Sequence, residues 1–235
     1  MPIDFDGADD VITFGSTDDI LTENGALTIS VWINPNTLGE GNIGRIVGRE
    51  NNVSPGVGFR MIATASVRFF VFGSTVLGVT ASNDSIVLNT WQHIALTWDG
   101  STTATNVHIY VNGIEVTYAA QTNGVSLANN STQVLAIGNT NTANAQTFDG
   151  QISEVALWDS VLSLYEIRQL AFSRVKRIPL QISLSNLKAY WPLDDFSNGS
   201  SASGSNSIRD LSPEQRHGTP ANSPLGYSEE VLSYV

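Results

Sequence analysis

The sequence contains no cysteine among its 235 residues. A chain without cysteine forms no disulfide, offers no thiolate to a metal ion and has no cysteine nucleophile. It also lacks a run of about 18 consecutive apolar residues, so we expect no membrane-spanning helix and no membrane insertion. The first residues show neither the positive segment nor the apolar stretch of a secretory signal peptide. These absences exclude thiol chemistry and leave the compartment of the protein open.

Charged residues are scarce, at 14% of the chain, and the formal net charge is −11. Binding to a phosphate backbone needs clustered lysine and arginine, so this charge argues against a nucleic-acid partner. The acidic surplus is compatible with calcium, because this hard cation prefers carboxylate oxygens. The same surplus is also explained by solubility alone.

Catalytic motifs are missing as well. The sequence has no H-E-x-x-H zinc motif, no G-x-S-x-G elbow, no phosphate-binding loop and no dinucleotide fingerprint. Glycoside hydrolysis needs two carboxylates across the sugar, and the closest strand segment, over 151–159, offers only Glu154 inside the strand. His93 and His108 alternate with apolar positions and are interpreted as structural or surface residues. The sequence therefore predicts a protein that is not an enzyme.

Short alternating apolar segments fill much of the chain. Leu27, Ile29, Val31 and Ile33 share one face of a predicted strand over 27–34. Residues 91–98 and 107–111 alternate in the same way. The dipeptide Asn112-Gly113 then predicts a two-residue hairpin turn, because a type I′ turn needs positive φ at both positions. Many short strands joined by turns predict an all-β, antiparallel sandwich.

The sequence predicts secondary structure in three further segments. Residues 2–14 are predicted to form a strand pair around an acidic turn, and residues 180–187 a connecting strand. Ser163 and Glu166 have the spacing of a capping box, which predicts one short helix near residues 164–173.

Four motifs, in order along residues 3–170, resemble one known family. They are IDFDGADDV at 3–11, WQHIALTWDG at 91–100, VHIYVNG at 107–113 and FDGQISEVALW at 148–158. This part of the chain resembles the laminin G-like domains of the concanavalin A-like lectin and glucanase jelly rolls. The resemblance implies an antiparallel jelly-roll sandwich that acts outside cells, in adhesion or carbohydrate binding.

The C-terminal segment resembles the same family in an unusual order. LKAYWPLDD at 187–195 and DLSPEQRHGT at 210–219 are similar to a stretch that the family usually places before its first strand. We therefore predict a single domain over 1–235, in which 187–235 supplies strands usually found at the N-terminus. Circular permutation explains this order, because chain termini often lie close together. Exchange of the segment between subunits and a truncated second domain are the alternatives.

Calcium is the best chemical hypothesis for a site. Asp6, Asp9 and Asp10 lie in a glycine-containing turn, and Asp149 lies in a second such turn. The resemblance implies calcium ligands near these strand ends, so these four residues are the candidate metal ligands. Ordinary turn chemistry explains the same Asp-Gly pattern.

Carbohydrate binding would use aromatic rings as stacking platforms. Trp91, Tyr110 and Trp158 are the candidate ligand-binding residues, with a position in the core as the alternative for each. Trp32 and Trp98 are assigned to the core.

The sequence leaves three functions open. The favoured one is a virion protein of a phage, such as a capsid decoration or cement protein or a tail or fibre component, because the chain starts at Met1 without an export signal. Its partners would be other virion proteins or surface glycans, and it would form a homo-oligomer. An extracellular carbohydrate-binding module is the first alternative, and a glycoside hydrolase is the second.

Overall fold

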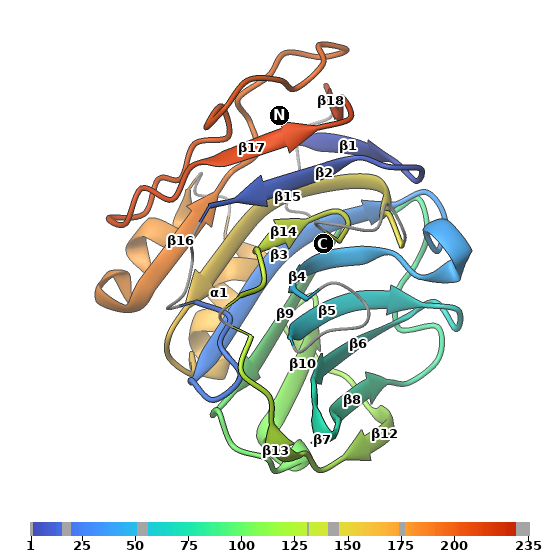
Figure 1. Ribbon diagram of the computed structural model, residues 1–235, viewed down its shortest axis with the longest axis vertical. Coiled ribbons are helices and arrows are strands. Elements are labelled where there is room, and N and C mark those ends of the chain that lie inside the picture. Colours follow the sequence, from blue (N-terminus) through green and yellow to red (C-terminus); the bar gives the residue numbers. More distant parts are fainter. Residues whose placement is uncertain are drawn as a thin grey trace.

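The computed structural model describes residues 2–15, 20–50, 56–130, 132–140, 146–173 and 177–228. These residues form two large antiparallel sheets packed face to face, with one α-helix on the outer side of one of them (Figure 1). The predicted all-β sandwich is therefore confirmed. The helix, α1, spans Leu164–Phe172, as the capping box predicts.

Sheet A is built around the long strand β15. In spatial order it contains β11 (Ile114–Glu115), β10 (Val107–Val111), β9 (Gln92–Trp98), β3 (Leu27–Pro35), β15 (Asp149–Trp158), β1 (Ile3–Asp6) and β18 (Leu225–Gly226). A further strand, β16 (Leu187–Trp191), pairs with the second half of β15, beyond the part that pairs with β1. Segments from both ends of the described chain thus share β15 as a partner.

Sheet B faces the viewer in Figure 1. In spatial order it contains β12 (Tyr118–Thr122), β8 (Leu77–Ala81), β6 (Ser66–Val71), β5 (Val57–Ile62), β4 (Arg45–Arg49), β14 (Ala136–Ile137), β2 (Val11–Phe14) and β17 (Gly218–Ala221). Two short strands, β7 (Gly73–Thr75) and β13 (Val125–Leu127), form a separate ribbon. Two 3₁₀ turns lie in loops, at Glu40–Asn42 and Ala104–Asn106.

The core lies between the two sheets and follows the predicted alternation. Leu27, Ile29, Val31 and Ile33 of β3 all point into it and are at most 3% exposed. Asn112 and Gly113 both have positive φ, 48° and 70°, as a type I′ turn requires. Alternation and turn chemistry therefore place these strands correctly.

The strand pair predicted over 2–14 is wrong in one respect, because its two strands do not pair with each other. β1 pairs with β15 and β18 in sheet A, whereas β2 pairs with β14 and β17 in sheet B. Phe5 enters the core from one sheet and Phe14 from the other. The acidic turn between the strands therefore crosses the rim of the sandwich, which lets both apolar faces meet one core.

The outer face of sheet A is covered by α1. Tyr110, Trp158, Ile167 and Leu170 belong to a second apolar cluster between this face and the helix. The strand predicted over 180–187 is wrong, because this segment forms two 3₁₀ turns, Ile178–Gln181 and Leu184–Asn186. Pro179 has no N–H to give to a sheet, and Ser183 adopts a left-handed φ of 43°. In the described part of the chain, no helix has the length and apolar character needed to cross a membrane.

The C-terminal segment contributes strands to both sheets within this one chain. β16 pairs with β15, β17 with β2, and β18 with β1. The ring centroids of Trp191 and Phe14 lie 4.0 Å apart, and the indole N–H of Trp191 donates to the carbonyl of Arg216. The relation of this order to a circular permutation stays a prediction, and residues 229–235 of the predicted segment lie outside the described residues.

Candidate functional site

The outer face of sheet B is the candidate site. In the described part of the chain the single α-helix lies against sheet A, so no α-helix covers sheet B (Figure 1). On β5 and β6 the residues that point into the core are Val57, Phe59, Met61, Val67, Phe69 and Val71. The alternating positions, Gly58, Arg60, Arg68 and Phe70, therefore point to the outer face. Arg60 and Arg68 are partly exposed there.

Three arginines form a row across this face. Arg45 of β4 lies directly opposite Arg60 of β5, and Arg60 lies opposite Arg68 of β6. The side-chain oxygen of Gln146 accepts hydrogen bonds from Arg45 at 2.7 Å and from Arg60 at 3.0 Å. We call Arg45, Arg60 and Arg68 the arginine row.

An aromatic ring supports two members of the row. The guanidinium of Arg60 lies 4.7 Å from the centroid of Phe70, and that of Arg45 lies 5.8 Å from it. Both distances are within the range of cation–π attraction. Gly58 lies beneath the ring of Phe70, and a Cβ at this position would come within 2.5 Å of that ring. The missing side chain therefore lets the ring lie close to the sheet.

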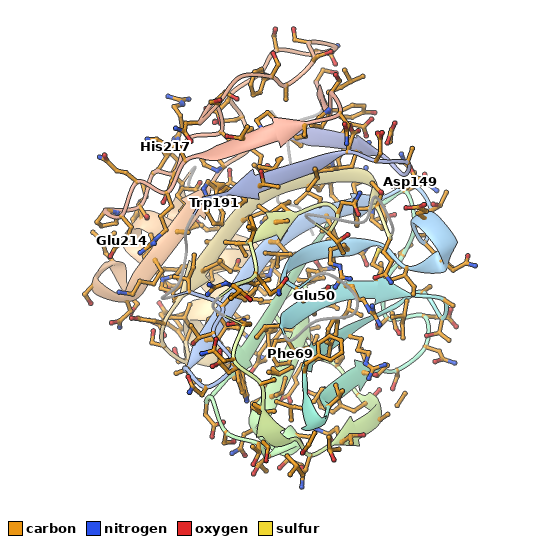
Figure 2. The ribbon with its side chains drawn as sticks, viewed as in Figure 1. Glu50, Phe69, Asp149, Trp191, Glu214 and His217 are labelled. Carbon is orange, nitrogen blue, oxygen red and sulfur yellow. The ribbon has the colours of Figure 1, made fainter. Side chains whose placement is uncertain are left out.

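The row is electrostatically strained. Burial, and after it the charge of Arg60, lower the pKa of Arg45 to about 9. Burial and the charge of Arg68 also lower the pKa of Arg60. Glu50, which Figure 2 shows over β4 and β5, pairs with Arg45. Among the described residues no carboxylate lies within ion-pair distance of Arg60 or Arg68. The face is thus locally cationic in a strongly acidic chain.

None of these arginines was predicted from the sequence as a site residue. Alternation alone places Arg60 and Arg68 outside the core, because each lies between two apolar neighbours. Their meeting across the strands depends on the register of β4, β5 and β6, which alternation does not determine.

The acidic turn between β1 and β2 gathers three of the four predicted metal ligands. One carboxylate oxygen each from Asp6, Asp9 and Asp10 lies within 4.8 Å of the others. Asp10 is only 3% exposed, and its Oδ2 accepts the backbone N–H of Asp6 at 3.0 Å. Its Oδ1 is buried and has no hydrogen-bond partner among the residues that the structure describes. An unpaired buried carboxylate oxygen among other carboxylates is a donor set that suits calcium.

Burial is the main cause that raises the pKa of Asp10 to about 7, and the charges of Asp6, Asp9 and Asp4 add to it. The hydrogen bond from the Asp6 N–H acts in the opposite direction. A bound cation would compensate both the burial and the repulsion.

Asp149 lies next to the acidic turn but is not one of the three grouped carboxylates. It pairs in register with Asp6 across β1 and β15, at the rim of the sandwich (Figure 2). Its carboxylate accepts hydrogen bonds from the hydroxyl of Thr37 at 2.6 Å and the amide of Asn36 at 3.3 Å. The Asp149 carboxylate is therefore hydrogen-bonded to the loop after β3. It does not belong to the group formed by Asp6, Asp9 and Asp10.

The predicted aromatic platforms need correction. Trp158 is 1% exposed, and its indole N–H donates to the carbonyl of Ile182. Tyr110 is 7% exposed, and both rings belong to the cluster beneath α1. A ring packed in this way has no free face for a sugar. Trp91 is half-buried.

Two possible catalytic groups are held in the packing. His93 is fully buried, its Nε2 lies 2.8 Å from the hydroxyl of Ser30, and burial lowers its pKa to about 3. Glu154 accepts a hydrogen bond from the hydroxyl of Tyr190, and burial raises its pKa. His93 is therefore neutral at physiological pH and belongs to the contact between β3 and β9.

Solved structures with a similar fold include carbohydrate-binding and laminin domains. A "putative carbohydrate binding protein" from Bacteroides ovatus matches 96% of this chain at 19% identity with a TM-score of 0.62, and this chain spans 61% of its length. The CBM40 domain of the Ruminococcus gnavus IT-sialidase, solved with α2,3 sialyllactose, matches 62% of this chain and 82% of its own at 14% identity, with a TM-score of 0.50. Domains LG4-5 of the mouse laminin α1 chain match 68% of this chain and 42% of their own at 16% identity, with a TM-score of 0.48.

A comparison with curated proteins gives no match. A laminin G family model, described as the concanavalin A-like lectin/glucanases superfamily, matches residues 6–168. This match covers most of the described sandwich, including the acidic turn and the arginine row, and confirms the resemblance seen in the four motifs. The chain belongs to the concanavalin A-like lectin/glucanases superfamily.

Proposed function

We propose that this domain binds carbohydrate without catalysis, and that the sugar lies on the outer face of sheet B. The arginine row is the observation that carries this proposal. Two of its members, Arg60 and Arg68, are partly exposed on the sheet that α1 leaves uncovered. The carbohydrate-binding names among the similar structures support the class of ligand.

The chemistry of the face suits a sugar. Each guanidinium offers several N–H donors in one plane, and sugar hydroxyls and carboxylates accept them. The Nε–H groups of Arg60 and Arg68 are buried and have no hydrogen-bond partner among the described residues, so a sugar would meet the terminal N–H groups of these partly exposed side chains. Phe72 is half-buried and packs edge-on against Phe70 at 5.5 Å, which adds an apolar surface beside the donors. A ligand that combines polar edges with an apolar face fits this surface.

A glycan array followed by calorimetry tests the proposal. We expect binding in the micromolar range to at least one glycan and no release of sugar from a polysaccharide panel. Absence of binding across the array would contradict the proposal. Release of reducing sugar would instead favour glycoside hydrolysis, the second alternative function that the sequence leaves open.

We also propose that Asp6, Asp9 and Asp10 bind one structural calcium ion. The unpaired Oδ1 of buried Asp10 supports this site. Calorimetry with CaCl₂ on protein freed of metal by EDTA should show one binding event, which Asp10→Asn removes. Asp84→Asn removes an equal charge from an exposed loop and should leave the event unchanged. Unchanged calcium binding in Asp10→Asn would contradict the site.

The virion role favoured from the sequence stays a prediction without support from the similar structures. Its location, in a virion or alternatively outside cells, also stays a prediction, as does homo-oligomer formation. Carbohydrate binding, the alternative from the sequence, agrees better with these relatives.

A further inference from the structure

We infer that the sugar bound on sheet B carries a carboxylate, and that Arg60 and Arg68 hold this group between them. This inference rests on the proposed function and adds the chemical class of its ligand.

The register of the strands brings the two arginines together. Arg60 and Arg68 are direct partners across β5 and β6 and point to the same face. Directly opposite residues of an antiparallel pair have Cβ atoms about 5 Å apart, so two long side chains can reach one carboxylate. The charge of Arg68 is strong enough at Arg60 to contribute to its lowered pKa.

Within the described part of the chain, neither arginine has a negative partner. No carboxylate of the described residues lies within ion-pair distance of either guanidinium, and Arg68 donates no hydrogen bond to any described residue. Like charges directly opposite each other destabilise a sheet. Arg60 is held in this position by Gln146 and by the ring of Phe70. An anion between the two guanidinium groups would remove the repulsion and use the unpaired donors.

The charge of the whole chain decides which anion fits. A net charge of −11 repels a polyanion at long range, which disfavours nucleic acid and heavily sulfated polymers. A single carboxylate on a sugar meets less of this repulsion. Its two oxygens also match the planar fork of a guanidinium. The face therefore favours an oligosaccharide with one acidic residue.

A matched pair of ligands tests the inference. Calorimetry would compare 3′-sialyllactose and glucuronyl-lactose with lactose, which lacks the carboxylate. We expect the carboxylated sugars, or one of them, to bind about tenfold or more tightly than lactose, the effect of one charge-assisted hydrogen-bonded pair. Added NaCl should lower the affinity for the carboxylated sugars and leave the affinity for lactose unchanged.

Variants distinguish a specific role of Arg60 and Arg68 from an effect of the overall charge of the protein. Arg60→Gln and Arg68→Gln should each abolish the preference for the carboxylated sugar. Arg68→Lys keeps the positive charge and should therefore retain part of the preference. The rest should be lost, because lysine lacks the planar fork of the guanidinium. Arg168→Gln makes the same charge change on α1, the helix that covers sheet A, and should have no effect on this preference. Melting temperatures of all variants check that each one is folded.

The outcomes are distinct. Equal binding of lactose and the carboxylated sugars, unchanged by the variants, would overturn the inference and leave carbohydrate binding standing. Sulfated lactose binding as tightly as the carboxylated sugars would overturn the carboxylate assignment. Failure of every glycan to bind would overturn the proposed function itself.

Discussion

At the scale of single residues, Gly58 sets the geometry of the arginine row. A side chain at this position would meet Phe70 within 2.5 Å and the guanidinium of Arg45 at 2.9 Å. These groups lie on the sheet only because the glycine leaves room for them. The composition of β5 alone does not show this, because the contact depends on residues from two neighbouring strands.

Gly58→Ala should therefore destabilise the domain. Forcing a methyl group into a filled space costs about 1–3 kcal/mol. A loss of 1 kcal/mol lowers the melting temperature of a domain of this size by about 2–4 °C. Thermal melting checks the value, with Gly15→Ala as the control because no atom of the described residues, its chain neighbours aside, lies within 4 Å of the added Cβ. Equal melting temperatures for the two variants would contradict this view of the site.

The acidic turn makes stability depend on pH when calcium is removed. The pKa of Asp10 is about 7 in the folded chain and about 4 when unfolded, so the folded state retains a proton over this range. Its contribution to the free energy of unfolding is full below about pH 4 and is lost as the pH rises through about 7. We expect the melting temperature in EDTA, relative to that of Asp10→Asn, to fall over this range.

Calcium should remove this pH dependence, because the cation stabilises the charged carboxylate. Asn resembles the protonated acid, so Asp10→Asn provides the reference curve at every pH. Parallel curves for the two proteins in EDTA, from about pH 4 to 7, would show that Asp10 does not titrate in this way.

At the scale of elements, α1 decides which sheet is free to bind a ligand. The hydroxyl of Ser163 accepts the backbone N–H of Glu166, and the Glu166 carboxylate accepts the N–H of Ser163. This cap fixes the start of the helix, and its apolar side covers Trp158 and Tyr110. The capping box was predictable from spacing, whereas the burial of these rings needed the position of the helix on sheet A.

Ser163→Ala should lower stability by about 1 kcal/mol, the usual cost of an N-cap. The expected change in melting temperature is about 2–4 °C. Ser185→Ala, at an exposed position without a side-chain hydrogen bond to a described residue, provides the control. Ligand binding on sheet B should persist in both variants. A melting temperature equal to that of the control would show that the cap contributes little.

Elements were predictable where local pattern and tertiary environment agree. β3 and β9 follow their alternation, because each has one face on the core. The strands of 2–14 did not pair with each other, since their apolar faces find a larger core by joining opposite sheets. The acidic turn was predicted as part of a metal site, and its three predicted ligands, Asp6, Asp9 and Asp10, do meet, whereas Asp149 from the second turn is not in their group. The arginine row was missed because cross-strand register creates it.

At the scale of the whole molecule, the described residues from both ends of the chain close the sandwich. Asp210 is buried and accepts the backbone N–H groups of Tyr190, Ser212 and Arg216. This carboxylate ties the C-terminal loop to β16, and β16 completes one edge of β15. Residues 187–228 are thus integrated into the core and do not form a separate appendage.

A fragment of residues 1–180 should therefore fail to fold cooperatively. It lacks β16, β17 and β18 and would expose Phe14, which packs on Trp191. Circular dichroism with thermal melting checks this expectation. A soluble fragment with a sharp, cooperative transition would show that the N-terminal part closes the domain by itself.

The most direct test of the central claim is NMR mapping of a bound sugar. Titration of the labelled protein with 3′-sialyllactose should shift the Nε–H signals of Arg60 and Arg68 and the backbone amides of Gly58 and Gly78. Signals from α1 should stay in place. Shifts confined to α1 or the acidic turn, with the signals of sheet B unchanged, would contradict the assignment of this face as the carbohydrate site.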